Sequence, residues 1–202
     1  MILTCESNFW DDYLAESDEV DYRHDSIQEI ATELFAASTD ENDYVKRAFE
    51  FVRDEISHSW DIQSTRITRK ASEVLLYKEG ICYAKSNLLC AILRTKGIPV
   101  GFCYQRLTIG DTPDTGYCIH AMNAVFFKSH GAWKRLDARG NKAGIEAEFN
   151  LDEERLAFPV RQEYMEADYP VIYMDPNPNT MNTLKQHTDC LTMYLHGLPT
   201  HL

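Results

Sequence analysis

Three side chains in the middle of the chain, those of Cys82, His120 and Asp137, are of the types that a thiol-dependent enzyme uses. A nucleophilic cysteine needs a base, and the base needs a group that orients it. Cys82 follows a glycine at the expected start of a helix, where exposed backbone amides and the positive end of the helix dipole favour a thiolate over a thiol. These residues and their order along the chain therefore permit a thiol triad.

The helix that would carry Cys82 has clear end signals. It begins near Cys82 and is expected to continue to Lys96. Gly97 supplies a C-terminal cap, and Pro99 prevents the helix from continuing.

The other two side chains fall on strand-like segments. Three such segments follow the helix, at 100–109, 117–127 and 132–138, and a hairpin loop at 128–131 joins the last two. His120 lies on the second segment and Asp137 near the end of the third. Side chains on paired strands can meet across a sheet, so this imidazole and this carboxylate can be neighbours.

The remaining elements frame this region. Ser26 and Glu29 are typical of a capping box at a helix start. Apolar periodicity and turn residues predict an N-terminal arm over 1–24, a helix over about 42–57, a short helical turn over 71–76, an irregular segment over 139–170 with a short helix at about 152–157, and a C-terminal helix over about 180–195. Helices followed by an antiparallel sheet predict an α+β fold, with the nucleophile helix packed on the sheet. Without repeats or a flexible linker, residues 1–202 are expected to form a single domain.

Four short motifs contain or flank Cys82, His120 and Asp137. They are Gly80-Ile81-Cys82-Tyr83-Ala84, Leu93-Arg94-Thr95-Lys96-Gly97-Ile98-Pro99, His120-Ala121 and Trp133-Lys134-Arg135-Leu136-Asp137. In this order they resemble the transglutaminase-like core. In that family a glycine-x-cysteine opens a helix that ends in an arginine and a glycine-isoleucine-proline, and a histidine strand and a tryptophan-x-x-leucine-aspartate strand follow. The resemblance covers about residues 45–140.

The resemblance implies a papain-like fold in which Cys82 is the nucleophile, His120 the general base and acid, and Asp137 the group that orients the imidazole. The family includes transglutaminases, transglutaminase-like proteases, peptide amidases and members that have lost activity. The first hypothesis is therefore a cysteine protease or amidase that cleaves amide bonds through a thioester acyl-enzyme. The alternatives are a protein-glutamine or other acyl transferase, and a non-catalytic binding module that keeps the fold.

Two departures from the family pattern affect the expected site. Many members have a tryptophan two residues after the histidine, where this chain has Met122, which would alter the cleft wall. Many members also use an aromatic residue upstream of the nucleophile in the oxyanion hole. His58 aligns best with that position and Trp60 is the competing candidate. The backbone amide of Cys82 would be the other oxyanion donor.

Further residues near the motifs are weighed as minor contributors. Tyr83 and Arg106 are possible substrate contacts, although a salt bridge is the simpler role for Arg106. Cys118 shares a strand face with His120 and could lie in the cleft, but packing in the core is the simpler role.

Composition limits the partners and cofactors that the chain is expected to have. Its formal net charge is −12, which disfavours binding to nucleic acid or to an anionic membrane surface. The six cysteines include no CxxC pair, so no metal site and no cofactor are expected. No basic and apolar leader is visible, and a cytoplasmic location is the expectation. The expected partner is a peptide or amide substrate; the oligomeric state is left open.

Overall fold

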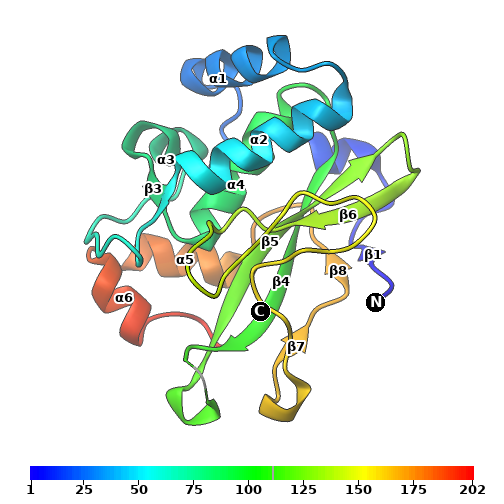
Figure 1. The fold of residues 1–202 in the computed structure, drawn as a ribbon. Coiled ribbons are helices and arrows are strands. Elements are labelled where there is room, and N and C mark those ends of the chain that lie inside the picture. The colour runs from blue at the N-terminus through cyan, green and yellow to red at the C-terminus, as the bar shows by residue number, and fades with distance from the viewer. Residues whose placement is uncertain (111) are drawn as a thin grey trace.

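A computed structural model describes residues 1–110 and 112–202 (Figure 1). Four helices form its first half: α1 (Asp25–Ala36), α2 (Glu41–Glu55), α3 (Ala71–Tyr77) and α4 (Cys82–Arg94). Helix α4 lies between the other helices and the sheet (Figure 1), and every residue from Tyr83 to Arg94 is buried. A helix that is buried along its whole length fixes its first residue, Cys82, relative to the rest of the molecule.

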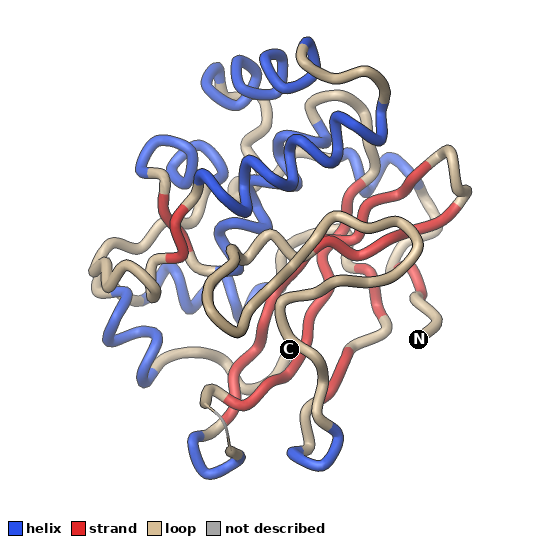
Figure 2. The backbone as a smooth tube through the Cα atoms, in the orientation of Figure 1, coloured by secondary structure: helices blue, strands red, loops and turns tan. Residues whose placement is uncertain are grey.

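The main sheet has four antiparallel strands in the order β6-β5-β4-β7. Their bounds are β4 (Val100–Thr108), β5 (Tyr117–Phe127), β6 (Ala132–Leu136) and β7 (Ala167–Asp168). Helices α1 to α4 lie on one side of this sheet, as the larger blue segments and the red strands of Figure 2 show. The predicted α+β fold, with the nucleophile helix packed on an antiparallel sheet, is confirmed.

Short elements complete the structure. Two parallel pairs join β1 (Thr4–Cys5) with β8 (Val171–Ile172), and β2 (Ser57–His58) with β3 (Glu79–Gly80). Three 3₁₀ helices span Trp10–Leu14, Pro113–Thr115 and Gln162–Tyr164. Helices α5 (Pro178–Gln186) and α6 (Cys190–His196) follow the sheet. No helix among the described residues is long and apolar enough to cross a membrane.

The local predictions differ from the structure in three places. The capping box at Ser26 is wrong: α1 begins at Asp25 and is capped by the His24 side chain, which accepts from the Ser26 amide. The helix predicted at about 152–157 is absent, and this part of the chain is an irregular loop over the sheet (Figure 2).

The C-terminal helix predicted over 180–195 is two helices. His187 has an extended backbone that ends α5, and the side chain of Asp189 accepts from the Thr192 amide to start α6. The break turns α6 toward the beginning of α4, where it contributes to the site described below.

Two clusters of apolar side chains cover the two faces of the sheet. The larger cluster joins the helices to one face, and a smaller one lies on the other face and includes Cys103, Met122 and Ala124. Because strand side chains alternate, His120 points to the same face as Met122. The pairing of Asn123 with Leu136, continued by one residue, places Asp137 opposite Met122 and therefore on the face of His120.

Candidate active site

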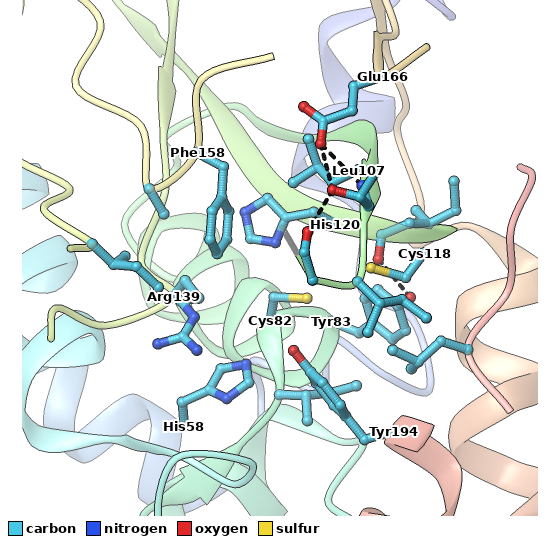
Figure 3. Close-up of a pocket in the computed structure, with 18 of the residues that line it drawn as sticks. His58, Cys82, Tyr83, Leu107, Cys118, His120, Arg139, Phe158, Glu166 and Tyr194 are labelled. Carbon is cyan, nitrogen blue, oxygen red and sulfur yellow. Dashed lines mark hydrogen bonds between the residues drawn. The ribbon is translucent and has the colours of Figure 1, made fainter. Parts of the chain in front are cut away.

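A cavity of about 350 Å³ lies where the start of α4 meets β4 and β5. Cys82, His120 and His58 line it, together with residues of the 139–170 segment and of α6. Figure 3 shows the Cys82 sulfur inside the cavity, between the rings of His120 and His58. The cavity therefore brings together a thiol and two imidazoles that are far apart in the sequence.

His120 and Asp137 form a buried pair. The imidazole Nε2 lies 2.8 Å from Asp137 Oδ2, and both side chains are almost completely shielded from solvent. Asp137 also accepts hydrogen bonds from the backbone amides of Arg139, at 3.2 Å, and Ala157, at 3.1 Å. Burial alone would raise the pKa of Asp137, but the charge of His120 and these hydrogen bonds lower it. The carboxylate is therefore held ionised and fixes the orientation of the ring.

The electrostatic environment favours the charged form of His120. Burial alone lowers the pKa of His120, but the negative charges of Asp137 and Cys82 and the hydrogen bonds with both residues outweigh it and raise the pKa to about 10. The Phe158 ring meets the imidazole edge-on, with centroids 5.0 Å apart. With Nε2 bonded to Asp137, the other ring nitrogen is left for the thiol. This arrangement suits a charged imidazole that faces the cavity.

Cys82 is the first residue of α4 and remains partly exposed to the cavity. The N-cap residue, Ile81, has an apolar side chain, which cannot accept a hydrogen bond from the free amides of the first turn. These amides are therefore available to an anion at this position.

The pairing of β2 with β3 positions His58. His58 lies opposite Gly80, and the Ser59 amide donates to the Gly80 carbonyl at 3.2 Å. A Cβ on Gly80 would lie 3.0 Å from Thr68 Oγ1 and 3.1 Å from Ala84 Cβ, so glycine lets the chain before Cys82 approach α4 closely. Gly80 thus sets His58 beside the start of the nucleophile helix.

The two oxyanion candidates have different surroundings. His58 is buried and lines the cavity. Burial, aided by the positive charge of Arg139, lowers the pKa of His58 well below its ordinary value, so the ring is neutral. Trp60 is not among the residues that line the cavity; it stacks on Tyr194 with centroids 4.3 Å apart. Of the two side chains, His58 is the one that faces the thiol.

The two residues proposed as substrate contacts are engaged elsewhere. Tyr83 borders the cavity, but it is buried and its hydroxyl donates to the Ile119 carbonyl at 2.7 Å. Arg106 lies outside the cavity lining: it donates to the Met165 carbonyl at 2.9 Å, and its guanidinium lies 3.6 Å from the centroid of the Tyr117 ring. The cavity lining instead begins at the next residue of the strand, Leu107.

Met122 is fully buried, packs with Cys103 and is not among the residues that line the cavity. The aromatic wall comes from two residues that the sequence did not single out, Phe158 and Tyr194. Their only sequence signal was that both are aromatic. The segments that carry them have no regular pattern that links them to Cys82.

Cys118 does line the cavity, as its strand face allowed. Burial raises the pKa of Cys118 to about 12, and the charge of Cys82 acts in the same direction, so Cys118 stays a thiol at neutral pH.

All six cysteines are free. Among the described residues no group of three or more His, Cys, Asp or Glu side chains could hold a metal ion.

Some solved structures resemble part of this chain. One structure that resembles the chain is that of a proposed cysteine protease from Cytophaga hutchinsonii, with a TM-score of 0.53 and 18% identity over 66% of this chain and 43% of that one. Another is a proposed protease from Parabacteroides distasonis, with a TM-score of 0.42 and 19% identity over 62% of this chain and 24% of that one. The chain thus spans less than half the length of either protein. The first likeness supports the fold.

No curated protein matches the sequence significantly. The family model of the transglutaminase-like superfamily matches residues 28–138, which is more than half of the chain and includes Cys82, His120 and Asp137. This chain belongs to the transglutaminase-like superfamily.

Proposed function

We propose that the protein is a thiol-dependent enzyme that cleaves amide bonds, with Cys82, His120 and Asp137 as its triad. One observation carries the proposal: the buried His120–Asp137 pair, at 2.8 Å, faces the cavity into which the Cys82 thiol points from the start of α4. A nucleophile and a base that share a cavity, with an orienting group bonded to the base, are the arrangement that acyl transfer to a thiol requires.

The reaction proceeds in two steps. The Cys82 thiolate attacks the carbonyl carbon of the amide and forms a tetrahedral oxyanion, to which the Cys82 backbone amide and the neutral His58 ring donate. The intermediate collapses to a thioester while the His120 imidazolium protonates the departing amine. In the second step His120 takes a proton from water, the hydroxide adds to the thioester carbonyl, and the acid leaves as the thiolate and imidazolium return.

The identity of the acceptor separates the enzymatic alternatives. With water as acceptor the protein is a protease or amidase, which is the form we propose. With an amine as acceptor the same thioester yields a new amide, and the protein is an acyl transferase. Incubation of a peptide amide with the protein and an added primary amine distinguishes them: mass spectrometry should find the free acid, and a product that carries the amine would identify a transferase.

A non-catalytic binding module is the alternative from another class. It would be favoured if the 139–170 segment filled the cleft or separated Cys82 from His120. That segment instead forms one wall through Ala157 and Phe158, and the cavity stays open beside the thiol. This geometry supports an enzyme over a binding module.

Alkylation of each cysteine by iodoacetamide at pH 6, followed by peptide mass spectrometry, tests the proposal. We expect Cys82 to react faster than the exposed Cys5. At pH 6 an ordinary thiol is almost fully protonated, whereas a thiol beside a charged imidazole is expected to be present largely as the reactive thiolate. Cys82→Ala should remove the fast phase, whereas Cys118→Ala and Cys90→Ala should retain it. Equal rates at Cys82 and Cys5 would reject Cys82 as the nucleophile.

A further inference from the structure

Arg139 is a buried arginine that borders the cavity. Its two terminal guanidinium nitrogens donate to the two carboxylate oxygens of Asp61, one of them at 2.9 Å. Its backbone amide donates to Asp137 Oδ1 at 3.2 Å. One residue therefore bonds to the acid of the proposed triad through its main chain and to a distant part of the chain through its side chain.

The distant part is the turn that carries His58. Asp61 and Ile62 donate their amides to the His58 carbonyl, at 2.8 and 3.3 Å, and the Ser64 amide donates to the Ser59 carbonyl at 2.9 Å. Asp61 is thus fixed to His58 by the backbone. A bidentate contact between a guanidinium and a carboxylate restrains both position and orientation, which a single hydrogen bond does not.

The other surroundings of Arg139 are also rigid. The guanidinium carbon lies 6.0 Å from the centroid of Phe158, the ring that packs on His120. The next residue, Gly140, has a φ of 111°, and a Cβ there would lie 3.3 Å from the Arg53 carbonyl oxygen and from Lys85 Nζ. The turn after Asp137 is therefore pressed against the end of α2, from which β2 and His58 continue.

We infer that Arg139 is a positioning residue, which holds the His58 turn against the turn that carries Asp137 and so sets His58 relative to the thiol of Cys82. The inference rests on the proposed function, in which His58 donates to the oxyanion. Arg139 acts through His58 and Asp61, and does not itself touch the reacting atoms.

The charges around His58 together favour its neutral form. Arg139, Lys85 and His120 place positive charge near the ring, and Asp61 opposes them with a negative charge. A ring in this environment stays neutral, and its uncharged N–H group can donate without adding a buried charge to the site. Loss of the Arg139 side chain would remove both the restraint on the turn and one of these positive charges.

The test compares two reactions of Cys82 in the full-length protein. Acylation by p-nitrophenyl acetate passes through an oxyanion, whereas alkylation by iodoacetamide does not. In Arg139→Met we expect the acylation rate to fall on the order of 100-fold, since a misplacement of about 1 Å can have that effect. Alkylation should stay within about threefold of the wild type, because the thiol, His120 and the backbone contact to Asp137 remain.

Control variants separate the possible outcomes. Arg139→Lys keeps the charge but not the bidentate contact, and should recover part of the acylation rate. Arg155→Met removes an exposed arginine of the same segment and should match the wild type. If Arg139→Met does not fold, Asp61→Asn tests the contact from the other side and should also slow acylation more than alkylation. Acylation and alkylation that fall together, or acylation that does not fall, would overturn the inference.

An NMR titration measures the pH at which the His58 ring becomes charged. It distinguishes an electrostatic role of Arg139 from simple loosening of the turn. Arg139→Met should raise the pH at which the ring becomes charged, whereas Asp61→Asn should leave it neutral, because it removes a negative charge. A rise in both variants would mean that the turn has merely loosened, and would contradict the electrostatic role. Failure of the proposed function would look different: Cys82→Ala would then release nitrophenol as fast as the wild type.

Discussion

At the scale of single residues, the site depends on where a few charges are buried. Asp137 is inaccessible to solvent, yet it accepts three hydrogen bonds, so its negative charge is satisfied and can stabilise His120. His58 and His120 lie in the same cavity and have opposite tendencies, one neutral and the other charged. Residues of the same type can thus have different proposed roles, one as oxyanion donor and one as acid and base.

The first prediction concerns the pH range of the reactive pair. In the wild type His120 is charged below a pKa of about 10 and loses its proton above it. Asp137→Asn removes the carboxylate that supports the charge, so His120 should become neutral at a lower pH. We expect alkylation of Cys82 at pH 6 to slow by about tenfold or more, a change of one pKa unit being tenfold in protonation.

The measurement is the rate of iodoacetamide labelling of Cys82 as a function of pH. The two proteins should differ most at acidic and neutral pH and converge above pH 10, where His120 is neutral in both. Asp114→Asn, at an exposed position, is the control and should follow the wild type. A constant ratio between wild type and Asp137→Asn at all pH values would contradict this role for Asp137.

At the scale of elements, α4 carries a second ionisable group close to its first residue. The Lys85 ammonium donates to the Arg53 carbonyl, at 3.3 Å, and to the Ile56 carbonyl at the end of α2. These contacts satisfy carbonyls that a helix end leaves free. Lys85 thereby ties the nucleophile helix to the segment that leads into His58.

The second prediction follows from the burial of Lys85. Burial, aided by the charge of Arg139, lowers the pKa of Lys85 from 10.5 to about 7. Between these values the unfolded chain binds a proton that the folded chain does not, so this group makes the free energy of unfolding rise with pH. The slope is at most about 1.4 kcal/mol per pH unit for one proton. In Lys85→Met this contribution should disappear.

Urea unfolding of the wild type and the variant at several pH values between about 7 and 10 measures this difference. Lys46→Met removes a half-exposed lysine of α2 and should leave the slope unchanged. If Lys85→Met has the same slope as the wild type, Lys85 is charged throughout this range in the folded protein.

At the scale of the whole molecule, charge is distributed unevenly. The chain has a net charge of −12, whereas Arg139, Arg161 and Glu166 line the cavity together with the charged His120. A negative molecule attracts cationic substrates over a distance, but the contacts inside the cavity decide which of them react. Overall charge should therefore affect encounter more than chemistry.

The third prediction uses this difference. For a peptide amide with several lysines, kcat/KM should fall several-fold as salt rises from about 0.02 to 0.2 M, because salt screens attraction beyond the Debye length. The corresponding kcat should change little. A neutral peptide amide of the same length is the control, with no salt dependence expected. An equal salt effect on both peptides would contradict steering by net charge.

Local order along the chain was enough to predict several parts of the fold and of the candidate site. The glycine, apolar and aromatic patterns around Cys82, His120 and Asp137 predicted the nucleophile helix, the two strands and their α+β arrangement. These predictions succeeded because a helix start, a strand register and strand alternation are fixed by residues that are close in the chain.

The other side chains of the candidate site could be identified only from the folded chain. Phe158 reaches His120 from an irregular loop, Tyr194 arrives on α6, and Arg139 meets Asp61 across 78 positions of the chain. The folded structure also places Arg106 outside the cavity. Of His58 and Trp60, only His58 lines the cavity that contains the thiol. Such contacts join segments without regular periodicity, and their geometry arises from packing of the whole chain, which no local pattern encodes.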